Sequence, residues 1–394
     1  MAITVCVGVK TLYTPEAGGV LWAYLNWALG FRALGCEVIW GEELRPDHSP
    51  EEIASLVVGA RERLQPFGLA DRLALLPLEA DGWRATEIEG CLPFATAVDA
   101  DVLVNFAYAL PQQVLDAFPR TVVVDIDPGL LQLWVARRDM SFGRYHYYFT
   151  IGETVGRPGS GIPDLGVSWH HTPPCVSLDW WPVTSSSPSM PFTTVTQWWG
   201  DWMPDEAGGY ENSKRAGFGA FLDLPSLGRH KLELVAPFPE GDRERPELVR
   251  RGWSVKTPGD VASSATEYQR YIQRSRGEFS CAKPSCVRMQ SAWISDRTVC
   301  YLASGKPAIV QHTGPSRYLP EADGLFRFRT PHEAAGMLGA VEADYERQCR
   351  NARALAEEHF DARKVLTRML ECVFDGSRTS PSPPGTRHRP VLET

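Results

Sequence analysis

The chain has 394 residues, of which 43% are hydrophobic and 22% are charged, and its formal net charge is −8. This composition is normal for a globular protein, and the length favours two domains. The acidic balance, without a long run of lysine or arginine, argues against nucleic acid as the main partner.

The amino-terminal segment predicts a first strand and not a targeting signal. It reads MAITVCVGVK and lacks a basic region followed by a long apolar core. No stretch approaches the roughly 20 uninterrupted apolar residues of a membrane span. The nine cysteines are scattered along the chain, which favours free thiols in a reducing compartment. We therefore expect a cytoplasmic monomer or homodimer with no membrane partner.

A strand–helix–strand pattern opens the first half of the chain. Residues 3–9 predict a strand, residues 20–34 an amphipathic helix, and residues 37–40 a second strand. Residues 101–105 and 121–124 predict further strands, with helical patterns between them. Such a βαβ succession is typical of a parallel sheet with right-handed crossovers.

A serine-rich segment at residues 184–189 is the best linker, and strands alternate with helices again beyond it. The later strand candidates are residues 192–197, 231–235, 253–256, 278–281, 308–311 and 325–328. We expect an α/β fold with two Rossmann-like, doubly wound domains facing each other across a cleft. The predicted boundaries are 1–183 for the first domain, 190–360 for the second, 361–374 for a last helix and 375–394 for a disordered tail.

The most informative stretch is residues 293–314, WISDRTVCYLASGKPAIVQHTG, which predicts a helix followed at once by a buried strand. Ser295 is a good N-cap, and Asp296 and Arg297 occupy the first turn of the helix. Free N–H groups at such a helix start can hold a phosphate, and Arg297 adds a positive fork.

Three further residues follow this strand at its carboxyl end, where open α/β sheets usually bind ligands. They are His312, Thr313 and Gly314. The alternative is that residues 293–314 form an ordinary capped helix and strand without a ligand-binding role.

Residues 3–374 as a whole resemble the GT-B glycosyltransferases, which move a sugar from a nucleotide diphosphate onto an acceptor. Gly18 and Gly19 after the first strand, the segment 295–307 and the helical run 333–374 carry the resemblance. It implies that Gly18 and Gly19 face the reaction centre and that residues 295–297 bind the donor phosphates. It also implies a last helix, residues 361–374, that crosses back to the first domain. The paired glutamates that some members use to hold the donor have no clear counterpart.

Glycosyl transfer needs a clamp for the departing diphosphate. For this clamp we favour Ser295 and Arg297, together with Lys283 and Arg288 from the preceding loop. Positive charge and N–H groups stabilise the charge that grows on the leaving group, so they act mostly in the transition state. The alternative is that Lys283 and Arg288 are merely solvated.

The reaction also needs a group that accepts the proton of the attacking hydroxyl. Asp127, or else Asp125, follows the predicted strand 121–124, and Glu153 and His146 are further candidates. In the other large glycosyltransferase architecture a D-x-D pair binds a metal, and this alternative stays open. The two-domain pattern favours the acceptor side, so we expect no divalent metal and no cofactor besides the nucleotide-sugar co-substrate.

The sequence therefore predicts a glycosyltransferase that acts on a small-molecule acceptor such as a specialised metabolite. A dinucleotide-dependent oxidoreductase is disfavoured, because Gly8 is followed by no G-x-G-x-x-G. Two alternatives remain: a nucleotide-sugar epimerase of the same architecture, and a non-catalytic protein that binds nucleotide sugars.

Overall fold

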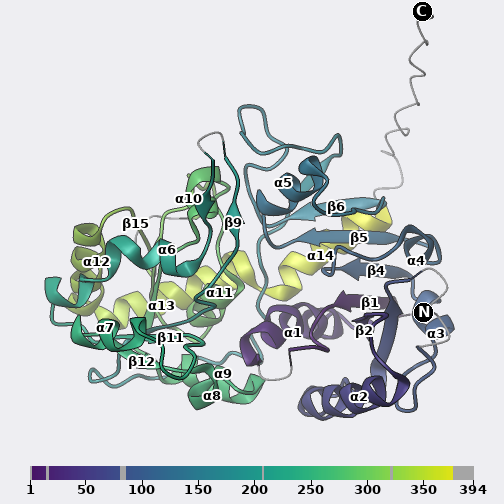
Figure 1. The fold of residues 1–394 in the computed structure, drawn as a ribbon, viewed down its shortest axis with the longest axis horizontal. Coiled ribbons are helices and arrows are strands. Elements are labelled where there is room, and N and C mark those ends of the chain that lie inside the picture. The colour runs from purple at the N-terminus through teal and green to yellow at the C-terminus, as the bar shows by residue number, and fades with distance from the viewer. Residues whose placement is uncertain (1, 15–16, 80–85, 206–207, 320–322, 376–394) are drawn as a thin grey trace, which may run out of the picture.

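Two parallel sheets, one in each half of the chain, dominate the computed structural model (Figure 1). The structure describes residues 2–14, 17–79, 86–205, 208–319 and 323–375. All but the first residue of the tail predicted at 375–394 lies outside these ranges.

The first sheet has the strand order β3-β2-β1-β4-β5-β6-β7, and all its pairs are parallel. Strands β2 and β3 extend the sheet on one side of β1, and the strands from β4 onward extend it on the other side. The topological switch point, where such sheets bind ligands, therefore lies at the carboxyl ends of β1 and β4. The strands are β1 (Thr4–Val9), β2 (Glu37–Leu44), β3 (Leu73–Pro77), β4 (Val102–Asn105), β5 (Thr121–Asp125), β6 (Tyr147–Thr150) and β7 (Trp169–His171). The helices of this domain are α1 (Gly18–Ala33), α2 (Pro50–Leu64), α3 (Phe94–Val98), α4 (Gln112–Asp116) and α5 (Leu130–Arg137).

The second sheet repeats this topology with the parallel order β12-β11-β8-β13-β14-β15. Its strands are β8 (Phe192–Val195), β11 (Leu232–Val235), β12 (Ser254–Lys256), β13 (Gly277–Ser280), β14 (Ala308–Gln311) and β15 (Leu325–Phe328), and a small hairpin adds β9 (Trp202–Met203) and β10 (Tyr210–Glu211). The helices are α6 (Lys214–Phe218), α7 (Glu244–Arg250), α8 (Pro258–Val261), α9 (Ala265–Arg274), α10 (Pro284–Met289), α11 (Asp296–Ala303), α12 (Pro331–Ala343) and α13 (Tyr345–Leu355). The predicted fold class, with two doubly wound Rossmann-like sheets, is therefore confirmed.

The sequence did not predict the full extent of β2, which continues to Leu44 through two glutamates. Glu42 is fully buried, and its carboxylate accepts hydrogen bonds from the N–H groups of Thr11 and Leu12 and from the Trp40 indole. A buried carboxylate is tolerated when its oxygens are satisfied in this way. Glu42 thereby fixes the loop between β1 and α1, which leads to the cleft.

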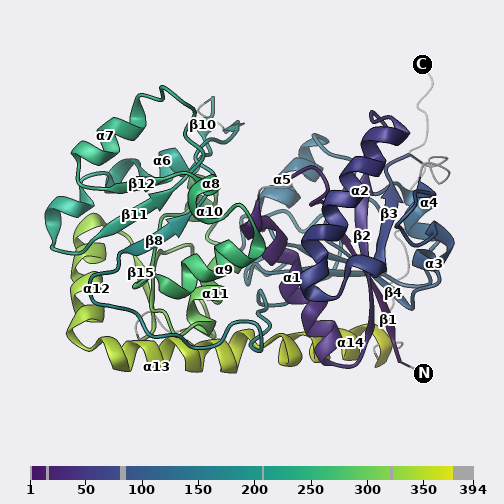
Figure 2. The same cartoon turned by 90° about the horizontal axis from the view of Figure 1, so that it is seen from below.

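Two stretches of chain connect the domains. Residues 172–191 lead from β7 to β8, and α13 continues through a π-helical turn (Ala356–Phe360) into α14 (Ala362–Asp375). Figure 2 shows α13 and α14 running along one side of the molecule, so that α14 reaches the first domain and packs on α1. The two stretches are bonded to each other, because Val176 N–H donates to Phe360 O at 2.8 Å and Ala362 N–H donates to Val176 O at 3.0 Å.

The domains also pack directly against each other through aromatic side chains. The Trp22 indole of α1 is buried and donates to the carbonyl of Ala265 at 2.7 Å. Its ring also contacts the ring of Trp181, which belongs to the connecting stretch 172–191, edge-on at 4.7 Å between centroids. None of the helices within the described residues is long and apolar enough to cross a membrane.

Candidate active site

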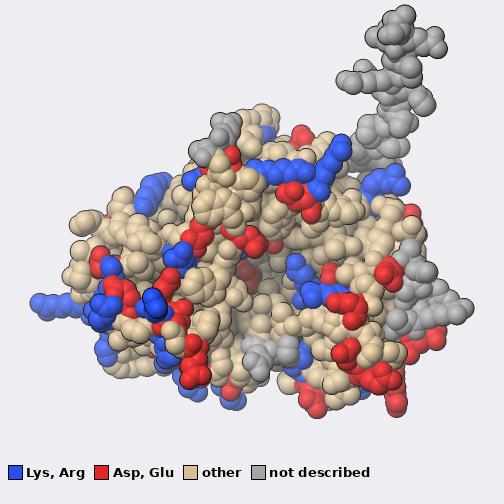
Figure 3. Space-filling model, in the orientation of Figure 1, with Lys and Arg blue, Asp and Glu red and all other residues tan. Residues whose placement is uncertain are grey.

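A cavity of about 650 Å³ lies between the two domains. It is lined by the loops that follow β1, β5, β8 and β11 and by the start of α11, so it opens at the carboxyl ends of both sheets. Figure 3 shows the surface hollowed between the two lobes. Doubly wound sheets bind their ligands at this edge, and we call this cavity the cleft.

The start of α11 forms part of the second domain's side of the cleft. Ser295 caps the helix, since its Oγ accepts the N–H of Arg297 at 3.2 Å, and both Ser295 and Asp296 line the cavity. The remaining N–H groups of the first turn and the positive end of the helix dipole favour an anion here. Burial raises the pKa of Asp296, and the charge of Asp127 raises it further.

Arg297 lines the cleft as well, but its guanidinium is bonded inward. Nε donates to the buried carboxylate of Glu278 at 2.8 Å, Nη1 to the carbonyl of Val195 at 2.8 Å, and Nη2 to Ser280 Oγ at 2.6 Å. The charge is therefore paired within the domain. Arg297 joins α11 to β8 and β13, and this geometry makes it a residue that positions the helix.

Lys214 supplies a cation that the sequence analysis did not single out. Its side chain lines the cleft, is buried, and donates from Nζ to the carbonyl of Cys281 at 2.5 Å. Burial lowers the pKa of Lys214 to about 7, and the neighbouring charge of Arg297 adds to this effect. Lys283, which precedes α10, lines the same cavity.

A local signal for Lys214 exists in the sequence. Ser213 is an N-cap whose Oγ accepts the N–H of Ala216, so Lys214 is the first residue of α6. A lysine in the first turn opposes the helix dipole. In the structure this lysine lines the cleft, and its ammonium group donates to the carbonyl of Cys281.

Gly18 and Gly19 line the cleft from the first domain and allow α1 to approach the second. Gly18 N–H donates to the carbonyl of Ala262 at 3.1 Å. A Cβ at Gly18 would collide with the carbonyl of Ser264, and one at Gly19 would lie 2.8 Å from the Tyr268 ring. Only glycine permits this contact.

The two aspartates after β5 have different surroundings. Asp125 is fully buried, and its carboxylate accepts hydrogen bonds from Gln132 Nε2 and Thr150 Oγ1, both at 2.8 Å, and from Asp127 N–H at 2.9 Å. Burial raises the pKa of Asp125 to about 7. Asp127 lines the cleft, and no described residue donates a hydrogen bond to its carboxylate. Asp127 is therefore the one of this pair whose carboxylate is available to a ligand.

Glu153 lies outside the cleft, in a second cavity. Its buried carboxylate accepts the N–H of Arg317 at 3.0 Å and a short hydrogen bond from Ser316 Oγ. It thus ties β6 of the first domain to a loop of the second.

The residues after β14 support the cleft from behind. Thr313 Oγ1 donates to the carbonyl of Trp293 at 2.7 Å, and Gly314 N–H donates to His312 Nδ1 at 3.2 Å. Gly314 has a φ of 130°, and a Cβ there would collide with the carbonyl of Gln290. None of His312, Thr313 and Gly314 lines the cleft, since the segment carrying Trp293 lies between.

Arg288 points away from the cleft. Its Nη1 donates to Asp205 at 2.8 Å, and its guanidinium lies 3.7 Å from the centre of the Tyr210 ring. Of the predicted donor-binding residues, the structure therefore gathers Gly18, Gly19, Lys283, Ser295, Asp296 and Arg297 around the cleft. Within the described part of the chain, no group of three or more His, Cys, Asp or Glu side chains is arranged to hold a metal ion.

Together, the twin sheets and the cleft at their facing edges define the GT-B fold. Among similar solved structures, HepE from Anabaena in complex with UDP is 13% identical, with a TM-score of 0.54 over 95% of this chain and 100% of that chain. AviGT4, a glycosyltransferase involved in avilamycin A biosynthesis, is 12% identical, with a TM-score of 0.56 over 95% of this chain and 99% of that chain.

The pneumococcal O-GlcNAc transferase GtfA, in complex with UDP and GlcNAc, is 10% identical, with a TM-score of 0.57 over 95% of this chain and 99% of that chain. Identities this low show a shared fold. No protein-family model matches the sequence, and no curated protein matches it.

Proposed function

We propose that this chain is a glycosyltransferase that moves a sugar from a nucleotide-diphosphate donor to a small-molecule acceptor in the cleft. One observation carries the proposal: the start of α11 and Lys214 line the same cavity as the carboxylate of Asp127. Two similar structures, HepE and GtfA, are complexes with UDP, which makes UDP the first nucleotide to test.

The second domain holds the donor in this proposal. The N–H groups at the start of α11, with Lys214 and Lys283, bind the diphosphate. Its negative charge grows as the bond to the sugar breaks, so these groups stabilise the transition state more than the bound donor. The pKa of Lys214 is about 7 in the free protein. An adjacent anion raises this pKa and so keeps the ammonium group protonated.

The first domain supplies the proton acceptor. The acceptor hydroxyl forms a bond to the anomeric carbon while the bond from that carbon to the phosphate oxygen breaks. The nucleoside diphosphate leaves with this electron pair, and the hydroxyl proton passes to the carboxylate of Asp127. Asp125 fixes Asp127 by accepting its N–H group.

The proposal is tested by titrating the protein with UDP in a calorimeter and then analysing products from UDP-glucose by mass spectrometry. A transferase forms a glycosylated product only when an acceptor is present. A sugar isomer formed from the donor alone would establish an epimerase, and donor binding without turnover for any acceptor tried would establish a binding protein. Failure to bind UDP or any other nucleoside diphosphate would refute all three functions.

A further inference from the structure

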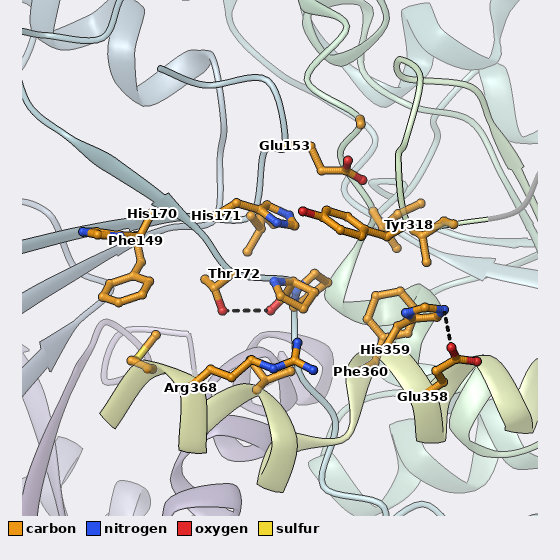
Figure 4. A pocket seen from close by; sticks show the side chains of 18 of the residues that line it. Phe149, Glu153, His170, His171, Thr172, Tyr318, Glu358, His359, Phe360 and Arg368 are labelled. Atoms are coloured by element: carbon orange, nitrogen blue, oxygen red, sulfur yellow. Dashed lines mark hydrogen bonds and ion pairs between the residues drawn. The ribbon is translucent and has the colours of Figure 1, made fainter. Parts of the chain in front are cut away.

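A second cavity, of about 330 Å³, lies where the two stretches that connect the domains pass each other. It is bounded by Thr172 and Pro174 of the first stretch, by Phe360 and Met369 of the second, and by the ends of β6 and β7 (Figure 4). It shares no lining residue with the cleft.

The interior of this hinge cavity is apolar and uncharged over most of its surface. Phe149, Ile294, Phe360 and Met369 contribute apolar side chains. The His171 ring of the first domain stacks on the Tyr318 ring of the second, with 5.7 Å between centroids and an angle of 1°. Burial lowers the pKa of His171 to about 4, so the ring is neutral at physiological pH.

One cation of the lining, Arg368, is exposed to solvent and forms no ion pair with a described residue. Arg368 extends from α14 along the cavity in Figure 4, and no described residue forms a hydrogen bond or ion pair with its guanidinium. Glu153 lies on the opposite side of the cavity, and its carboxylate is occupied by Ser316 and Arg317. Glu358 is exposed to solvent, and its Oε1 lies 3.9 Å from His359 Nε2.

We propose that the hinge cavity is a second ligand-binding site, separate from the cleft, for a molecule with an apolar body and one anionic group. The volume lies at the lower end of the roughly 300–1,000 Å³ of small-molecule sites. An apolar body replaces water that the lining binds poorly, and the anionic group pairs with Arg368.

A ligand in this cavity would contact a wall that it shares with the cleft. Ala292 and Ile294 line the hinge cavity, whereas Trp293 and Ser295 line the cleft. The segment 292–295 therefore separates the two cavities and leads directly into α11. This second site goes beyond the proposed function, because it requires no turnover, but its test uses UDP to fill the cleft and therefore rests on the proposed binding of UDP there.

The experiment uses 8-anilinonaphthalene-1-sulfonate, a fluorescent probe with apolar rings and one sulfonate. The full-length protein is titrated with the probe in the presence of excess UDP, which occupies the cleft. Cys372→Phe places a ring in the cavity, because Cys372 lines it from α14. Arg368→Gln removes the cation, and Lys364→Gln is the control, because Lys364 is likewise exposed on the same helix but does not line the cavity.

The expected result is one saturable site in the unmodified protein and in Lys364→Gln, about tenfold weaker binding in Arg368→Gln, and no saturable binding in Cys372→Phe. Equal binding by all four proteins would overturn the proposal, as would equal weakening by Lys364→Gln and Arg368→Gln. Urea unfolding checks that each variant is folded. If Cys372→Phe does not fold, the comparison of Arg368→Gln with Lys364→Gln decides alone.

Discussion

Raising the pH from 7 to 9 should weaken the binding of UDP by deprotonating Lys214. Burial holds the pKa of Lys214 at about 7 in the free protein, whereas the diphosphate stabilises the ammonium form in the complex. Binding above pH 7 therefore takes up a proton, and affinity falls as pH rises. If the pKa in the complex lies well above 9, the loss from pH 7 to 9 is about 50-fold, or ~2 kcal/mol.

Isothermal titration calorimetry measures this effect directly. The terminal phosphate of UDP titrates near pH 6, so the chosen range leaves the ligand's charge unchanged. Titrations in buffers with different ionisation enthalpies report the proton uptake. Lys214→Met is the matched control: it should bind UDP more weakly at pH 7, and its affinity should approach that of the unmodified protein at pH 9. A pH-independent affinity in the unmodified protein, or the same slope in Lys214→Met, would refute the assignment of Lys214 to the diphosphate.

Three further changes test other parts of the site. Arg297→Met leaves the carboxylate of Glu278 buried without its cation and should lower the free energy of unfolding in urea by about 3–5 kcal/mol. Arg288→Met removes only a surface ion pair and should lower the same free energy by about 0–1 kcal/mol. Gly18→Ala should lower the free energy of unfolding by about 1–3 kcal/mol, because its Cβ would collide with Ser264. Gly336→Ala, which has open space around it, should leave the stability unchanged or raise it. Equal effects of the two substitutions would contradict the packing argument. Excess chelator should leave transferase activity undiminished if cations of the protein hold the diphosphate, as proposed. Activity restored only by a divalent ion would favour the D-x-D alternative.

The sequence was a good guide to the fold because most strands are buried on both faces. Such strands are short apolar runs, and β4 and β5 were predicted from them. The edge strand β7, Trp169–His171, is partly exposed and carries aromatic and histidine side chains, so it lacks that signal. The equivalent order of the two sheets appeared only in the structure, because strand order depends on contacts between distant segments.

The candidate site was predictable where local chemistry sets the geometry. Ser295 as an N-cap and Gly18 and Gly19 at the start of α1 follow from local rules, and all three line the cleft. The direction of a long side chain is not local. Arg297 is turned inward by Glu278, which lies on a different strand, and the low pKa of Lys214 comes from burial by the folded domain.

The most direct test of the proposed mechanism compares acceptor-dependent UDP release by the unmodified protein and by Asp127→Asn. In the proposed mechanism this carboxylate acts on the acceptor, so the variant should fold and bind UDP with unchanged affinity, while kcat falls by about 100-fold or more. If Asp127→Asn turns over at the rate of the unmodified protein, the cleft does not use this carboxylate as its proton acceptor, and the mechanism proposed for it is contradicted.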